Sequence, residues 1–143
     1  MILMNAINEV VARLKSQLGT DTVYLLDKAK MQEFNMHILP IYLVYTSPYP
    51  STETYERRNQ KTVANMTICI HYFVNIVTDI DTDLRTELSK IYTALMNYKF
   101  TYIEDIYIKE FAIPQLRFDE IAEAIVMLEL KVLFNYKNME SKL

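Results

Sequence analysis

Two stretches of the chain, residues 63–77 and 121–136, alternate apolar and polar residues for about three times the length of an ordinary strand. Successive side chains of a strand point to opposite faces, so each stretch predicts a long strand with one apolar face. The apolar positions are Ala64, Met66, Ile68, Ile70, Tyr72, Val74 and Ile76 in the first stretch and Val126, Leu128, Leu130, Val132, Phe134 and Tyr136 in the second.

The length of these strands has a consequence for their surroundings. Strands of this length reach about 50 Å, whereas the helix expected between them covers about 25 Å. We therefore expect other copies of the chain to cover the rest of the apolar face, as in a symmetric assembly.

Two amphipathic helices are predicted from the spacing of apolar residues. Residues 7–18 have the helical spacing, and Gly19 stands where a left-handed C-cap is needed. A second helix begins after Thr78, where Asp79, Asp81 and Asp83 gather and the helix dipole favours carboxylates. Its apolar stripe consists of Leu84, Leu88, Ile91 and Leu95.

Residues 38–46 and 100–113 predict two further strands, and 22–26 is a candidate short strand outside the main order. The alternation in 100–113 is imperfect, which indicates either a bulge or two partly covered faces. The predicted fold is α+β, with a mostly antiparallel sheet of about four strands and two helices packed on one face. The element order is α-β-loop-β-α-β-β, in a single domain over 1–143 with a polar tail at 138–143.

The segment 47–60 is predicted to be a long loop, because it combines two prolines with hydroxyl and charged residues. Tyrosine and arginine are enriched at interface hot spots, and long loops often carry function. Surface tyrosines that cap a core with their hydroxyls in water are the alternative explanation. The candidate subunit or partner interface consists of Tyr49, Tyr55, Arg57 and Arg58.

The composition argues against several classes of function. A net charge of -3 gives little attraction for a phosphate backbone, so we expect no direct nucleic-acid partner. A single glycine rules out glycine-rich phosphate loops, and we expect no cofactor. The sequence also predicts neither a signal peptide nor a membrane-spanning helix.

Metal binding and catalysis have few candidate residues. His37, Cys69 and His71 are the soft metal ligands, and a zinc site would need a carboxylate as the fourth ligand, so we expect no metal site. Cys69 and His71 share a strand face about 6 to 7 Å apart, which is too far for a nucleophile and its base. Adjacent acids such as Glu104 and Asp105 are typical of solvated surface charge, and we expect no catalytic residues.

Five segments carry a resemblance to a known family: INEVVARLKSQLG, ILPIYLVYTS, RRNQKTVANMTICIHYFV, DLRTELSKIYTALMNY and EAIVMLELKVLFNYK. Together they resemble the tail terminator, or tail-completion, proteins of long-tailed bacteriophages. The resemblance implies a non-enzymatic α/β virion protein that assembles as a ring, usually a hexamer, on the last ring of the tail tube. It also implies that the ring stops tube polymerisation and presents a surface to the head connector. The partners would be other copies of the chain, the tail-tube protein and a connector or neck protein. The protein would be made in the host cytoplasm and located in the tail-neck region of the virion.

Two alternatives stay open at this point. A head-completion or neck adaptor protein would occupy a different face of the same particle. A small α+β enzyme or ligand-binding domain would use His71, Cys69 or a buried carboxylate in a concave pocket. A two-fold dimer would also cover exposed strand surface as well as a ring does.

Overall fold

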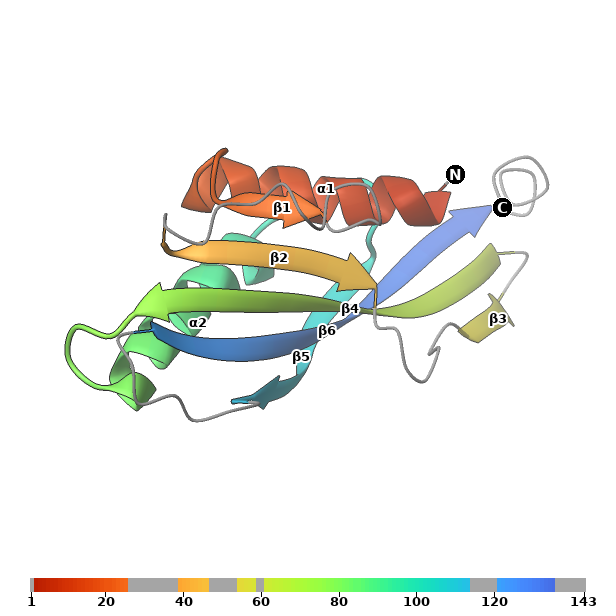
Figure 1. The fold of residues 1–143 in the computed structure, drawn as a ribbon. Helices are drawn as coiled ribbons and strands as arrows, with labels where there is room; N and C mark the ends of the chain where they lie inside the picture. Colours follow the sequence, from red (N-terminus) through yellow and green to blue (C-terminus); the bar gives the residue numbers. More distant parts are fainter. Residues whose placement is uncertain (1, 26–38, 47–53, 59–60, 114–120, 136–143) are drawn as a thin grey trace.

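The computed structural model describes residues 2–25, 39–46, 54–58, 61–113 and 121–135. It confirms the α+β class: two helices lie against one sheet (Figure 1). The helices are α1 (Ile2–Leu18) and α2 (Ile80–Met96). The strands are β1 (Val23–Leu25), β2 (Ile41–Thr46), β3 (Thr54–Arg58), β4 (Lys61–Asn75), β5 (Asp105–Ala112) and β6 (Ile121–Asn135).

The sheet is mixed and has six strands in the described part of the chain, not about four. Five strands follow the order β1-β2-β4-β6-β5, and β3 pairs with β4 outside this path. All pairs are antiparallel except β1 with β2. Since β6 pairs with β4 over its whole length, β2 and β3 share the other edge of β4. The predicted order therefore lacked β1 and β3, although β1 confirms the candidate short strand at 22–26.

The predicted long loop at 47–60 is in part a strand. Residues Thr54–Arg58 form β3 and pair with the first five residues of β4, from Arg58 opposite Lys61 to Thr54 opposite Asn65. Polar strands of this kind lack the apolar alternation that identifies a strand in a sequence. The pairing with β4 supplies the backbone hydrogen bonds instead. Residues 47–53 and the predicted tail at 138–143 lie outside the described residues.

The end of α1 and the start of α2 lie where the sequence predicts them, whereas α1 begins at Ile2, before the expected N-cap at Asn5. Gly19 has a φ of 122°, and its amide donates a hydrogen bond to the Lys15 carbonyl, as expected of a C-cap after α1. The Asp79 carboxylate accepts a hydrogen bond of 2.8 Å from the Thr82 amide at the start of α2. These caps confirm the two helix boundaries that the sequence predicts.

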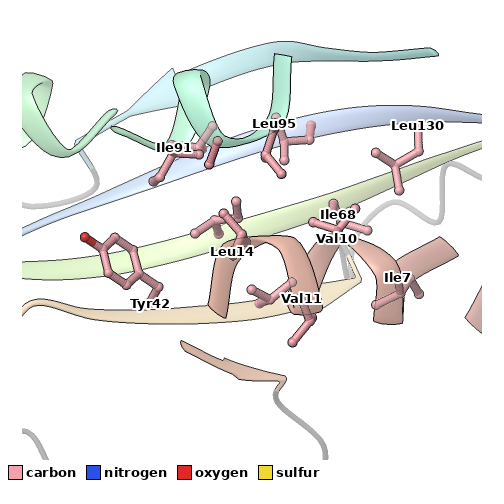
Figure 2. Packing of buried hydrophobic residues seen from close by; sticks show 14 of the residues in the cluster. Ile7, Val10, Val11, Leu14, Tyr42, Ile68, Ile91, Leu95 and Leu130 are labelled. Carbon is pink, nitrogen blue, oxygen red and sulfur yellow. The ribbon is translucent and has the colours of Figure 1, made fainter. Parts of the chain in front are cut away.

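One apolar core lies between the helices and the sheet. Figure 2 shows side chains of α1 and α2 packed against those of β2, β4 and β6. The helix-covered face of the sheet is the face with the even-numbered residues of β4 and β6. Its described side chains are at most 5% exposed: Ala64, Met66, Ile68, Ile70, Tyr72, Val74, Ala122, Ala124, Val126, Leu128, Leu130 and Val132.

This burial corrects the expectation that neighbouring copies must cover the long strands. The helix-covered face is buried within one copy of the chain from Ala64 to Val74 and from Ala122 to Val132. The expectation compared the strands with one helix, but α1 and α2 have 17 residues each. Both pack on this face, and each is about 25 Å long. Any assembly of the protein must therefore use other surfaces.

The opposite face of the sheet is also partly apolar. Ile41, Leu43 and Phe73 are buried there in a second, smaller cluster, with Tyr24, Leu39 and Ile121 packed around it. On the same face Met127 and Ile125 of β6 are only partly buried. The two faces thus differ in burial, since the even-numbered residues 64–74 of β4 and 122–132 of β6 are all buried and the opposite face of these strands is only partly buried.

Candidate functional site

The predicted interface residues lie at one end of the sheet as far as the structure describes them. Tyr55, Arg57 and Arg58 belong to β3, and Arg57 is exposed. Tyr49 lies outside the described residues. Figure 1 shows β3, the start of β4 and the end of β6 at one end of the sheet, away from α2. Three of the four predicted residues are therefore on a strand and not on a loop.

Two strand edges are open, that of β3 at this end of the sheet and that of β5 beside the middle of β6. In the described part of the chain, β3 pairs only with β4, and β5 pairs only with β6. An unpaired edge presents a row of N–H and C=O groups that can pair with another strand. The edge of β3 carries Glu56, Arg57 and Arg58, whereas the β5 edge begins with Asp105, directly after Glu104.

The β5 edge is regular only over its first half. Its register with β6 runs without interruption from Asp105 to Ile108 and shifts between Ile108 and Glu110. The shift confirms the bulge that the imperfect alternation of 100–113 allowed. Bulges and charged residues such as Lys109 are common means of preventing edge pairing. The part of β5 that can accept a further strand is thus Asp105–Ile108.

A histidine and a carboxylate are paired on the opposite face of the sheet. His71 Nε2 lies 2.8 Å from Glu123 Oε2, and the His71 ring stacks on Phe73 with 4.7 Å between ring centroids. Glu123 is buried, so the pair satisfies a carboxylate that would otherwise be costly to bury. Cys69 is buried two residues along the strand from His71. This arrangement accounts for His71 as a structural partner of Glu123.

The soft metal ligands considered from the sequence do not form a site in the described residues. Among these residues, no group of three or more His, Cys, Asp or Glu side chains is placed to hold a metal ion. His37 lies outside them. The described ligands, Cys69 and His71, are accounted for by the core and by Glu123.

A buried polar network joins the sheet to α2. The Tyr42 hydroxyl donates a short hydrogen bond to a Glu87 carboxylate oxygen, and Lys90 Nζ lies 2.9 Å from the other oxygen. The Tyr72 hydroxyl donates to the Leu84 carbonyl at 2.5 Å. Tyr42 and Tyr72 are 1% and 0% exposed, and Glu87 is 8% exposed. Because each of these polar groups has a partner, the network holds α2 on the sheet.

Burial raises the pKa of both tyrosines in this network above the ordinary value of 10.0. For Tyr42 the hydrogen bond to Glu87 and the charge of that carboxylate raise the pKa further. For Tyr72 the nearby Glu87 charge adds to the effect of burial, and Arg85 opposes it. The folded protein therefore holds both phenolic protons at pH values where the unfolded chain loses them.

We expect a loss of stability at alkaline pH from these two tyrosines. Their contribution is fully present below about pH 10 and is lost as the pH rises from there toward the folded-state pKa values, since only the unfolded chain is deprotonated in that window. Each tyrosine contributes a slope of up to about 1.4 kcal/mol per pH unit. Urea unfolding between pH 8 and 11 measures the slope. Tyr42→Phe and Tyr72→Phe should each reduce it, and Tyr92→Phe, at an exposed position on α2, is the control. Equal slopes in all four proteins would contradict the assignment.

The connection between α2 and β5 is held against α1. The Glu9 carboxylate accepts hydrogen bonds from the amides of Thr101 and Tyr102 at 2.6 and 2.9 Å. Arg13 Nε donates to the Ala94 carbonyl at 2.8 Å, and its guanidinium lies 4.3 Å from the centre of the Tyr98 ring. Such contacts fix the segment from which β5 begins.

A hollow of about 650 Å³ lies along this connection and is lined by residues 96–106. Its lining includes Glu104 and Asp105, the adjacent acids considered from the sequence, but none of His71, Cys69, Glu123 and Glu87.

Comparison with known proteins gives no family. A scan against models of protein families finds no match, and a search of curated proteins finds no significant relative. In the described residues no helix has both the length and the apolar character needed to cross a membrane.

Proposed function

We propose that the chain is a structural, non-enzymatic virion protein of a long-tailed bacteriophage, a tail terminator that forms a ring on the end of the tail tube. The ring would stop tube polymerisation and provide the docking surface for the head connector. Its partners would be further copies of the chain, the tail-tube protein and a connector or neck protein in the tail-neck region.

One observation carries the proposal. The sheet has a complete core on its helix-covered face but two open edges, β3 and β5, in the described part of the chain. A subunit with these properties folds alone and can still join neighbours through strand edges. Two different edges that meet head to tail make a heterologous contact, which closes into a ring when the rotation allows.

The two 15-residue strands support the same proposal, because their hydrophobic pattern is part of the resemblance to tail terminators. The predicted element order fits the structure in part, since β1 and β3 are additional. The enzyme alternative has less support. His71 and Glu123 pair with each other, Cys69 is buried, and none of these three residues lines the hollow at 96–106. We keep the neck adaptor as an outcome of the test below.

We expect the purified chain to cap tail tubes. Tail-tube protein is polymerised with and without the chain, and tube lengths and ends are measured by negative-stain electron microscopy. A terminator should shorten the tubes and leave a ring at one end. Unchanged tube lengths, with the chain bound instead to isolated head connectors, would indicate the neck adaptor. Binding to neither would contradict a role at the head-tail junction.

A further inference from the structure

We infer that the subunits of the ring are joined by a specific strand pair: the outer edge of β3 in one copy and the Asp105–Ile108 half of β5 in the next copy. The inference rests on the proposed function, since it names the contact that would build the ring. Both edges are open in the described residues, as stated above.

The directions of the strands allow β3 of one copy to pair with β5 of the next copy as an antiparallel neighbour. The strands β3, β4, β6 and β5 are neighbours in this order, they lie side by side at the position of Asn65 and Lys131, and every pair among them is antiparallel. Four alternating strands give two outer strands of opposite direction. If the next copy repeats the same arrangement, its β3 runs antiparallel to β5. The sheet can thus continue from copy to copy while the helices stay on the same side.

The register follows from the faces of the sheet. Asp105 is opposite Lys131, Lys131 is opposite Asn65, and Asn65 is opposite Thr54. These four positions share one face, as do positions 56 and 58 of β3, because side chains alternate. In a continued sheet Asp105 can therefore stand opposite Thr54, Glu56 or Arg58. A shift by one residue would exchange the two faces.

The charges of the opposed residues and the number of residues that are paired favour one of these registers. With Asp105 opposite Arg58, the next copy is displaced by four residues along the strands, all four residues of the regular half of β5 are paired, and the residues opposite each other at 105 and 58 have opposite charge. With Asp105 opposite Glu56, two acidic residues stand opposite each other and fewer residues of β3 and β5 are paired. With Asp105 opposite Thr54, the paired stretch is shorter still. Directly opposed unlike charges stabilise a strand pair, and like charges destabilise it. The preferred register also places Ile108 opposite Tyr55, an aliphatic residue beside an aromatic one.

The bulge limits the contact to this half of β5. Beyond Ile108 the register shift turns the strand, and Lys109 and Glu110 are exposed there. An edge with one open half and one blocked half accepts a short strand of defined length, and β3 has five residues. This match disfavours unlimited edge-to-edge aggregation.

Exchange of the charges tests the contact. Asp105→Arg and Arg58→Asp are each expected to raise the concentration at half assembly about tenfold or more, as measured by light scattering. The double variant should restore assembly, because it exchanges the two charges. Asp21→Arg, at an exposed position before β1, makes the same change of charge and should leave assembly unchanged. Circular dichroism confirms that each variant is folded.

Hydrogen exchange of the unmodified chain gives a second readout that needs no variant. Amides of 54–58 and 105–108 should become protected when the chain assembles, whereas those of the exposed face of α2 should not. A ring that forms without this protection, and without sensitivity to the two single variants, would overturn the β3–β5 contact and leave the proposed function standing. A chain that never assembles would overturn both.

Discussion

Replacement of Leu128 by alanine is expected to lower the free energy of unfolding by about 2 to 5 kcal/mol. Leu128 and its register partner Ile68 are both 0% exposed, beneath the helices of the same copy. Truncation leaves a cavity that the surrounding side chains fill only in part, so the lost burial and the cavity both contribute. Urea unfolding of the isolated chain measures the change.

Met127→Ala is the matched control for this prediction. Met127 is the next residue of β6, and its side chain points to the opposite face, where it is only partly buried. Its truncation should cost clearly less, because less apolar surface leaves water when the chain folds. Equal losses in both variants, or a loss from Leu128→Ala that occurs only in assembled protein, would contradict the statement that one copy covers its own apolar face.

Loss of the Tyr42 hydroxyl is expected to cost about 1.5 to 3 kcal/mol, the range for hydrogen bonds to charged groups. In Tyr42→Phe the Glu87 carboxylate stays buried and loses its donor from β2, while Lys90 remains beside it. Glu87→Gln should cost less because it removes the charge that needs solvation. The double variant should be less destabilised than the sum of the two, since the partners interact directly.

Tyr24→Phe is the control for the hydroxyl prediction. The Tyr24 hydroxyl donates to the Asp21 carbonyl at an exposed position, where water can replace it. The effect of this substitution should stay within about 0.5 kcal/mol. If Tyr42→Phe and Glu87→Gln prove additive, the two groups are not coupled and the network does not hold α2 on the sheet.

The sequence predicts the local and strongly periodic parts of the fold well. The start of α2 at the acidic cluster, the C-cap at Gly19 and the alternation in β4 and β6 each depend on residues that are close together in the chain, although the N-cap is Asp79 and not the Thr78 hydroxyl. Both helices pack on one face of a mostly antiparallel sheet, as predicted. In each case the physical cause acts within a few residues, so the pattern is visible without the structure.

Two parts of the structure differ from the predicted fold for non-local reasons: the strands β1 and β3, which the predicted order lacked, and the burial of the apolar face within one copy of the chain. β1 has three residues and is a strand because it pairs with β2, and β3 is polar and is a strand because it pairs with β4. The helix-covered face is buried because α1 and α2 both pack on it. The prediction compared the length of the strands with the length of α2 alone. Neither property is encoded in a local pattern.

The candidate site was predicted only in part for the same reason. Residue type alone identifies Tyr55, Arg57 and Arg58 as interface candidates. The structure places them on β3, a strand with an open edge in the described residues. Asp105 was interpreted as solvated surface charge, because its neighbour Glu104 is also acidic. Its position at the start of the other open edge becomes visible only when the order and direction of the strands are known.

The native mass of the full chain, measured by mass spectrometry over a range of concentrations and with tail tubes present, tests the central claim most directly. The account predicts a closed ring whose mass is a whole multiple of the 16.9 kDa chain, with six copies expected from the resemblance to tail terminators. A protein that stays at 16.9 kDa under all these conditions would contradict it.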